Sequence, residues 1–338
     1  MSANEYEKAL TFLQKSVFPK LGFDTGYSVV SIQYVGGEIM MVPPKELEKI
    51  VHIGRRTLLK SFHQVLDGAQ SNLLGSPQRI KFLDTLFNGR LGTSVDHLGS
   101  KRTLAGSASH YRNVFNSSQQ ILKRRRGKLP GAVFVVDSSS LAHVPTEINY
   151  ANEKKYSLVL RPVFQGRSQI DSVDVGGLSN VMGDAFNEWI LHSKVNVEPF
   201  SLLLARRLKI ANGGSVCPFQ SNCSKVSISL EPDGSLYTCL DMADSGQMPW
   251  GNAISGTFDE DVWDRLDARP SMLDNKCKAC PYLQSCQGGC MSEAIHATGS
   301  PYGRTNLCTV WEKLFYQMDK SIEIYGPDKI TKWLESLI

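Results

Sequence analysis

The hydrophobic positions of the first two hundred residues follow helical and strand-like spacings in turn. Apolar residues recur at helical spacing within residues 5–18, which predicts an amphipathic helix. Residues 29–35 form a β-rich run that ends at a Gly-Gly pair, which predicts a strand leading into a tight turn. Residues 132–136 are a short, continuous apolar run, typical of a strand buried in a parallel sheet.

The remaining elements of this part continue the same alternation. Further helices are expected at residues 44–66, 77–88 and 109–126. Further strands are expected at residues 67–72, 90–96 and 157–163. Because strands that alternate with helices form βαβ units, the sequence predicts an α/β fold whose parallel sheet is either open or curved into a barrel.

The pattern changes near residue 200. Two short strand-like runs flank the turn sequence Glu-Pro-Asp-Gly at 231–234, which predicts a β-hairpin over residues 226–239. An amphipathic helix is expected from about 306 to 325. We therefore expect two domains, residues 1–200 and residues 201–338.

Composition and charge exclude several classes of protein. Of the 338 residues, 41% are hydrophobic and 21% are charged, which is ordinary for a globular protein. No apolar run is long enough to span a membrane, and the polar N-terminal stretch lacks a secretory signal, so we expect a cytoplasmic protein. The net charge of +4 does not call for a nucleic-acid partner. The basic run at 123–128 is interpreted as a helix C-terminus, where cations offset the helix dipole.

The cysteines are confined to the C-terminal part, and none occurs in residues 1–216. They are Cys217, Cys223, Cys239, Cys277, Cys280, Cys286, Cys290 and Cys308. In a reducing compartment such cysteines bind metal more often than they form disulfides, and the C-x2-C pair at 277–280 supplies two thiolates from one turn. Eight thiolates make two four-thiolate sites, and two zinc ions and two iron–sulfur clusters both satisfy this count.

The cysteine spacing resembles the SPASM domain of radical S-adenosylmethionine (SAM) enzymes. Gly234 and Cys239 match its Gly-x4-Cys element, and residues 277–290 match its C-x2-C-x5-C-x3-C element. The resemblance covers residues 217–308 and implies two fully ligated [4Fe–4S] clusters. Cluster I would take Cys217, Cys223, Cys239 and Cys290. Cluster II would take Cys277, Cys280, Cys286 and Cys308.

The first two hundred residues resemble the incomplete (β/α) partial barrel of the same enzymes. Gly36, Gly37 and Glu38 end the first predicted strand and are similar to the GGE motif that receives the amino group of SAM. Glycines allow close backbone approach, and a carboxylate can pair with an ammonium group. Asn72 and Ser94, at the next two strands, resemble polar residues that face the cofactor in the family. The resemblance thus implies a SAM-like site and leaves open whether SAM binds.

The sequence departs from the family at the catalytic motif. Radical SAM enzymes hold their SAM-cleaving cluster with C-x3-C-x2-C, and these 338 residues contain no such motif. Residues 1–5 resemble the start of the helix that follows this motif in the family. Cleavage of SAM needs an iron with an open coordination site, which three thiolates leave and four do not. Either the protein lacks its own SAM-cleaving cluster, or the sequence is a truncated record of a full maturase.

Asp241 is a candidate general base. Related sulfatase-maturing enzymes place a catalytic aspartate directly after the cysteine that corresponds to Cys239. Here Leu240 occupies that position and Asp241 follows it. A shift of one residue in an extended segment reverses the direction of the side chain, so the alternative role of Asp241 is a solvated turn residue.

These observations predict an α/β radical SAM/SPASM-like protein that acts in peptide or protein modification. It would serve as an electron-transfer or substrate-docking partner of a complete radical SAM enzyme, with a peptide or protein as substrate. A complete peptide maturase, of which this sequence is a part, is the first alternative. A structural interaction module that holds two zinc ions is the second.

Overall fold

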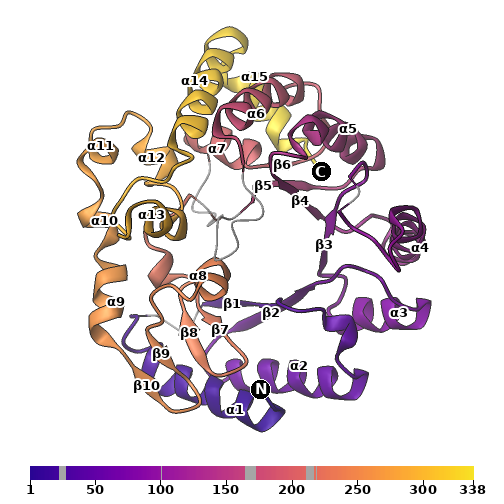
Figure 1. Ribbon diagram of the computed structural model, residues 1–338, viewed down its shortest axis with the longest axis vertical. Coiled ribbons are helices and arrows are strands. Elements are labelled where there is room, and N and C mark those ends of the chain that lie inside the picture. Colours follow the sequence, from indigo (N-terminus) through magenta and orange to yellow (C-terminus); the bar gives the residue numbers. More distant parts are fainter. Residues whose placement is uncertain (23–27, 100, 164–172, 211–216, 218) are drawn as a thin grey trace. The chain divides into compact units, whose positions relative to one another are not determined.

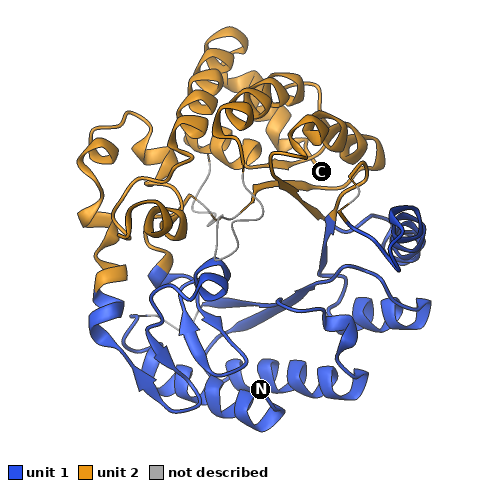
Figure 2. Cartoon of the chain, viewed as in Figure 1, with its two compact units in different colours: residues 1–94, 102–130, 224–264 blue, residues 95–101, 131–223, 265–338 orange. Residues whose placement is uncertain are grey.

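The structure is a computed structural model, and it describes residues 1–22, 28–99, 101–163, 173–210, 217 and 219–338. The chain divides into two compact units (Figure 2). Unit 1 comprises residues 1–94, 102–130 and 224–264. Unit 2 comprises residues 95–101, 131–223 and 265–338. Each unit is assembled from three stretches of chain, so the units divide the sequence differently from the boundary expected near residue 200, which stays a prediction.

The parallel strands of unit 1 are the first three of the chain (Figure 1). They are β1 (Val29–Tyr34), β2 (Gln64–Gln70) and β3 (Leu91–Val95), whose last residue is assigned to unit 2. Val29 pairs with Gln64, and Ala69 pairs with both Tyr34 and Leu91. The carboxyl ends of β1 and β2 therefore lie side by side, which places the loops after them next to each other.

Helices connect these strands as the hydrophobic pattern predicts. They are α1 (Ala3–Phe12), continued by a π-helical turn (Leu13–Val17), α2 (Pro44–Leu58), α3 (Pro77–Leu86) and α4 (Ala108–Arg126). One boundary was wrong: the helix expected through residue 66 ends at Leu58. Gln64, Val65 and Leu66 instead pair with β1, because hydrogen bonding along the sheet outweighs the local helical pattern.

The antiparallel sheet of unit 1 contains the predicted hairpin. Its strands are β7 (Ser229–Leu230), β8 (Ser235–Tyr237), β9 (Gly251–Asn252) and β10 (Thr257–Phe258). Ser229 pairs with Tyr237 across the turn, where Gly234 adopts a φ of +89° that favours glycine. The strands are shorter than predicted, and the buried rings of Trp250 and Trp263 pack edge to face against each other. Helices α8 (Leu240–Ser245) and α9 (Glu260–Asp267) follow β8 and β10 in the chain.

The parallel strands of unit 2 are β4 (Ala132–Val136), β5 (Leu158–Pro162) and β6 (Val197–Glu198). Ala132 pairs with Leu158, which also pairs with Val197. The predicted bounds of β4 are confirmed. Its burial alternates, however, because Val135 is partly exposed while its neighbours Phe134 and Val136 are buried. The α/β class with parallel strands is therefore confirmed in both units.

Among the described residues, the longest helix of unit 2 is α14 (Cys308–Tyr325), which packs against α6, α7 and α15. The other long helices are α5 (Val144–Lys154), α6 (Val175–Trp189), α7 (Phe200–Arg207) and α15 (Pro327–Glu335). Four short helices form and flank the cysteine-rich segment: α10 (Arg269–Met272), α11 (Asn275–Lys278), α12 (Leu283–Cys286) and α13 (Met291–Thr298).

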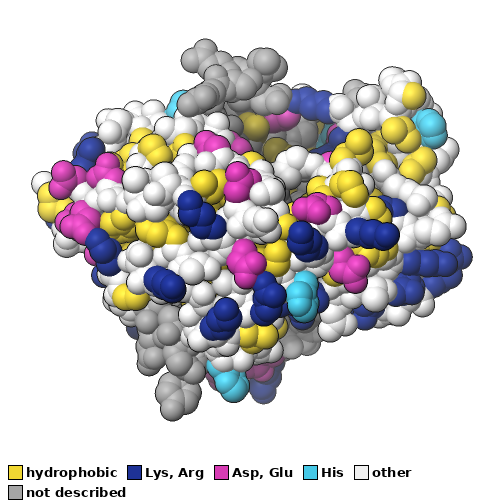
Figure 3. Space-filling model, turned by 90° about the horizontal axis from the view of Figure 1, so that it is seen from below, with side chains coloured by type: hydrophobic (Ala, Val, Ile, Leu, Met, Phe, Trp, Pro, Cys, Tyr) yellow, Lys and Arg dark blue, Asp and Glu magenta, His cyan; other side chains and the backbone are white. Residues whose placement is uncertain are grey.

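The surface carries mixed charge. Over most of the face drawn in Figure 3, Lys and Arg side chains are interspersed with Asp and Glu. Among the described residues, none of the helices combines the length and apolar character that crossing a membrane requires.

Candidate functional site

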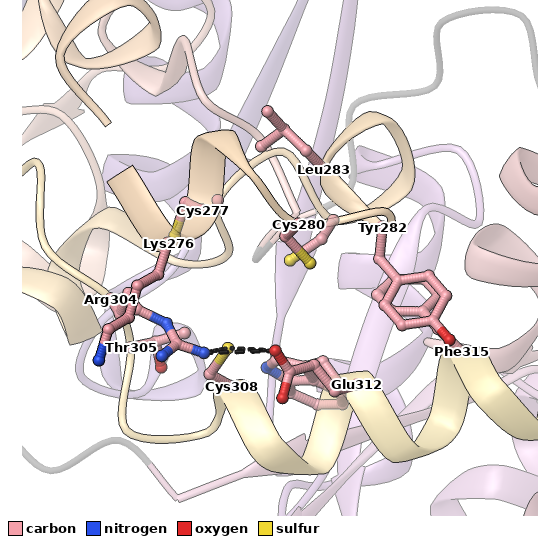
Figure 4. Close-up of a pocket in the computed structure, with 13 residues that line it drawn as sticks. Lys276, Cys277, Cys280, Tyr282, Leu283, Arg304, Thr305, Cys308, Glu312 and Phe315 are labelled. Carbon is pink, nitrogen blue, oxygen red and sulfur yellow. Dashed lines mark hydrogen bonds and ion pairs between the residues drawn. The ribbon is translucent and has the colours of Figure 1, made fainter. Parts of the chain in front are cut away.

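Four cysteines from three segments of unit 2 line one cavity (Figure 4). Cys277 belongs to α11, Cys280 follows that helix, Cys286 ends α12 and Cys308 begins α14. These are the four residues that the resemblance assigns to cluster II. Apolar side chains, among them Leu283, Trp311 and Phe315, supply much of the remaining wall.

Tight turns bring these cysteines to the same cavity. The backbone N–H of Cys280 donates to the carbonyl oxygen of Cys277 at 3.1 Å, so the C-x2-C segment closes into a single turn. After α12 the chain turns at Gly288, which has a φ of +81°. A Cβ atom at Gly288 would lie 2.7 Å from a methyl carbon of Leu273, so both the backbone and the packing require glycine there.

Burial opposes the ionisation of three of these four cysteines. Burial raises the pKa of Cys286 to about 12, and the charges of Cys308, Cys277 and Cys280 raise it in the same direction. Burial likewise raises the pKa of Cys277 and of Cys308. Without a cation Cys277, Cys286 and Cys308 therefore hold their protons at neutral pH, and a bound metal core would supply the positive charge that their thiolates need.

The arrangement of the four thiols can be compared with the ligand distances of known metal sites. A zinc ion holds its four thiolates at about 2.3 Å. In the part of the chain that the structure describes, no group of three or more Cys, His, Asp or Glu side chains converges closely enough to hold one metal ion. The four thiols surround a shared space, and four thiolates are the ligand set of both iron–sulfur clusters and structural zinc sites.

Three of the four cysteines assigned to cluster I belong to unit 2. A hydrogen bond to Cys217, followed by burial, raises the pKa of Cys290 well above its usual value. Burial and then the charge of Cys217 raise the pKa of Cys223 to about 11. The structure thus brings Cys217, Cys223 and Cys290 together. Cys239 belongs to unit 1, where it is the N-cap residue of α8.

The candidate SAM site lies in unit 1, at the carboxyl end of β1. Gly36 and Gly37 have φ values of +82° and +53°, and a Cβ atom at either position would meet no other atom within 4 Å. The backbone conformation therefore favours glycine, and the space beside it is open to a ligand.

Glu38 joins the ends of two strands through its carboxylate. Its Oε1 accepts hydrogen bonds from the backbone N–H of Met40 at 3.0 Å and the hydroxyl of Ser71 at 2.8 Å. Its Oε2 accepts one from the backbone N–H of Asn72 at 2.8 Å. Sequence reasoning missed this role, in which Glu38 fixes the loop after β1 to the loop after β2.

The two remaining candidates also lie in this part of unit 1. The Oδ1 atom of Asn72 accepts a hydrogen bond from the backbone N–H of Leu74 at 2.8 Å, so it is held by its own loop. The hydroxyl oxygen of Ser94, in β3, accepts one from the side chain of Gln70 at 3.1 Å. All five SAM-site candidates therefore lie in or just after the parallel strands of one unit.

Asp241 lies in the first turn of helix α8, not in an extended segment as the sequence suggested. Its backbone carbonyl accepts a hydrogen bond from the hydroxyl of Ser245 at 2.7 Å. Successive residues of a helix point about 100° apart, so Asp241 and Leu240 do not face opposite sides. The role of Asp241 as a base stays a prediction.

Sequence reasoning missed a polar cluster directly after β4. Burial raises the pKa of Asp137, but hydrogen bonds from Lys101 and Ser139 outweigh burial and lower the pKa to about 2. Asp137 is 6% exposed and also accepts a hydrogen bond from the backbone N–H of Ser140 at 3.0 Å. The signal was present in the sequence, because Asp-Ser-Ser-Ser at 137–140 follows the apolar run of β4.

Comparison with known proteins identifies the fold. No known family profile matches the chain, and no curated protein is similar to it in sequence. Several solved structures of anSMEcpe, an anaerobic sulfatase-maturating enzyme of the radical SAM/SPASM type, are similar in structure.

The structure of native anSMEcpe with bound AdoMet has a TM-score of 0.73 and 17% identity, covering 98% of this chain and 90% of that chain. The complex with AdoMet and the Kp18Cys peptide has a TM-score of 0.73 and 18% identity, covering 98% and 91%. The complex with the Cp18Cys peptide has a TM-score of 0.73 and 17% identity, covering 98% and 92%. With six parallel strands among its described residues, the chain has the α/β partial-barrel fold of radical SAM/SPASM enzymes.

Proposed function

We propose that this chain is an iron–sulfur protein that binds two [4Fe–4S] clusters and acts in the modification of peptides or proteins. It serves as an electron-transfer or substrate-docking partner of a complete radical SAM enzyme. The observation that carries this proposal is the cavity lined by Cys277, Cys280, Cys286 and Cys308. The structural similarity to enzymes solved with AdoMet and with peptides supports the same kind of function.

Each set of cysteines has a defined task in this proposal. Cluster II is held by the four cysteines of the cavity. Cluster I is held by Cys217, Cys223, Cys239 and Cys290, as the SPASM resemblance implies. When bound, such clusters supply one-electron transfer. Four protein thiolates around each core leave no iron open to SAM, which is why a separate SAM-cleaving cluster is required.

SAM itself is assigned to unit 1. Gly36 and Gly37 leave space for the ligand at the end of β1, and the charge of Glu38 is suited to an ammonium group. Asn72 and Ser94 provide polar groups from the neighbouring loop and strand. The same features suit the alternative of a full maturase, in which the SAM-cleaving cluster comes from residues outside this sequence.

Metal analysis of the anaerobically reconstituted full chain tests the proposal. About eight irons and eight sulfides per chain are expected, from two clusters of four. Cys308→Ala and Cys290→Ala should each retain about half of the iron, because each removes a ligand of a different cluster. The control is Thr309→Ala, which changes an exposed residue beside Cys308 and should retain all of it. Zinc without sulfide would reject the proposal in favour of the two-zinc module.

The same preparation distinguishes the proposed partner role from the alternative of a full maturase. With dithionite and SAM, the partner protein should form no 5′-deoxyadenosine alone. Reading the codons upstream of Met1 gives an independent answer, because an in-frame C-x3-C-x2-C motif there would support the full maturase.

A further inference from the structure

Arg269 is a fully buried cation in the cysteine-rich part of unit 2. It begins helix α10, and its relative exposure is 0%. Burying a guanidinium away from water is costly unless hydrogen bonds and an opposite charge compensate for it. The hydrogen bonds and charges around Arg269 therefore indicate its role.

The hydrogen bonds of Arg269 hold the loop between two cysteines of different sets. Its Nη2 atom donates to the carbonyl oxygens of Gly288 at 2.9 Å and Gly289 at 3.3 Å. This loop joins Cys286, assigned to cluster II, to Cys290, assigned to cluster I. Its Nε atom donates to the carbonyl oxygen of Pro301 at 2.7 Å, which ties in a second loop. Arg269 thus fixes the segment that the two proposed clusters share.

Among the described residues, no carboxylate pairs with the positive charge of Arg269. Its hydrogen-bond acceptors in the described chain are all backbone carbonyls, and its Nη1 atom is buried without any acceptor. Burial lowers the pKa of Arg269, and the largest charges that oppose this effect are those of four cysteines. They are Cys223, Cys290, Cys277 and Cys286. Cys223 and Cys290 are assigned to cluster I, and Cys277 and Cys286 to cluster II.

We propose that Arg269 is a positioning residue that supplies one shared countercharge to both clusters and raises the reduction potential of each. This inference rests on the proposed function, because it assigns the anionic partner of Arg269 to the thiolate-bound clusters. The unpartnered Nη1 donor and the absence of a carboxylate are explained together, since each cluster with four thiolates is an anion.

The direction of the effect follows from charge. Reduction adds one negative charge to a cluster, and a nearby buried cation stabilises the reduced state more than the oxidised state. Losing the cation should therefore lower both potentials. Arg304 provides the contrast, because the cysteine to which it donates a hydrogen bond is Cys308 of cluster II, at 2.8 Å from Sγ. Its loss should affect cluster II alone.

Potentiometric titration followed by electron paramagnetic resonance tests this in the reconstituted full chain. Arg269→Gln and Arg304→Gln are each made in the Cys308→Ala and Cys290→Ala backgrounds, so that one cluster is observed at a time. Arg269→Gln should make reduction about tenfold less favourable in both backgrounds, which is about 59 mV for a one-electron couple. Arg304→Gln should shift only the cluster that remains in Cys290→Ala.

The outcomes separate this inference from the proposed function. If the unsubstituted chain binds no clusters, the proposed function fails as well. If it binds both and Arg269→Gln moves neither potential, or only one, the inference alone is overturned. If Arg269→Gln assembles no clusters, Arg269→Lys keeps the charge and should restore them with potentials close to the original. Failure of the lysine variant would show that Arg269 acts only in folding, and would also overturn the inference.

Discussion

Arg304 donates a hydrogen bond to the sulfur of Cys308, with Nη2 2.8 Å from Sγ (Figure 4). The same nitrogen lies 3.3 Å from a carboxylate oxygen of Glu312, one turn further along α14. Burial raises the pKa of Cys308, while the hydrogen bond from Arg304 lowers it. A hydrogen bond from a side-chain cation therefore assists Cys308 in losing its proton.

Replacing Arg304 should make Cys308 less reactive in the metal-free protein. In Arg304→Gln the cation is lost, so the pKa of Cys308 rises and its thiolate fraction falls, and the thiolate is the nucleophile. We expect the rate of alkylation of Cys308 by iodoacetamide, followed by mass spectrometry, to fall about three- to tenfold near pH 8. Lys276→Gln is the control, because Lys276 lines the same cavity and should leave the rate unchanged. Equal rates in all three proteins would contradict the assignment.

The raised thiol pKa values predict that the metal-free protein loses stability in alkali. The native state retains the protons of Cys223 and Cys286 up to a pKa of about 11 and about 12, whereas the unfolded chain releases them near 9.0. Above about pH 9 the native state therefore binds more protons, and the free energy of unfolding falls by up to about 1.4 kcal/mol per pH unit for each thiol. Below that pH the contribution is fully present.

Urea denaturation of the metal-free protein between about pH 7 and pH 10.5 measures this slope. Cys286→Ala removes one of the two groups, so its free energy of unfolding should decline less steeply above about pH 9. An identical slope in Cys286→Ala would show that the decline comes from other groups.

The sequence was informative where short-range spacing decides the structure. The spacing of Cys277 and Cys280 predicted two thiols on one turn, and the SPASM resemblance added Cys286 to the same set; the structure places all three at one cavity. The bounds of β4 followed from its apolar run in the same way. The C-terminal end of α2 was wrong because the pairing of Gln64 with Val29 is a tertiary interaction that no local pattern contains.

Contacts between distant segments account for what the sequence did not reveal. Glu38 could be predicted as a ligand of SAM, but its hydrogen bond with Ser71 depends on the register of β1 against β2. Arg269 carried no signal at all in the sequence. Its burial becomes visible only when the loops at Gly288 and Pro301 close around it.

The basic run at the end of α4 should stabilise the fold rather than bind a ligand. Asp84, which is 1% exposed, accepts hydrogen bonds from the Nε atoms of Arg125 at 2.6 Å and Arg126 at 2.8 Å. Asp84→Asn should therefore lower the free energy of unfolding by about 2 kcal/mol, measured by urea denaturation. Arg124→Gln changes an exposed neighbour in the same run and should alter it by less than about 0.5 kcal/mol. A larger loss in Arg124→Gln than in Asp84→Asn would contradict this role.

The open space beside Gly36 gives a test of SAM binding that is independent of the clusters. A methyl group at Gly36 fits without a clash, but it projects into the space assigned to the ligand and strains a φ of +82°. Gly127, which follows α4, has a φ of +75° and equally open surroundings. Both alanine variants should therefore lose about 1 kcal/mol of stability, so any difference between them in SAM binding reports on the site itself.

Calorimetric titration with SAM should show at least about a tenfold weaker affinity for Gly36→Ala, equivalent to about 1.4 kcal/mol of binding free energy. Gly127→Ala should bind as tightly as the unsubstituted chain. Because the site is built from β1 and the loops of unit 1, binding should persist in Cys308→Ala and Cys290→Ala. If Gly36→Ala and Gly127→Ala bound SAM equally well, the ligand would have to lie elsewhere, and the end of β1 would keep only the structural role that Glu38 has there.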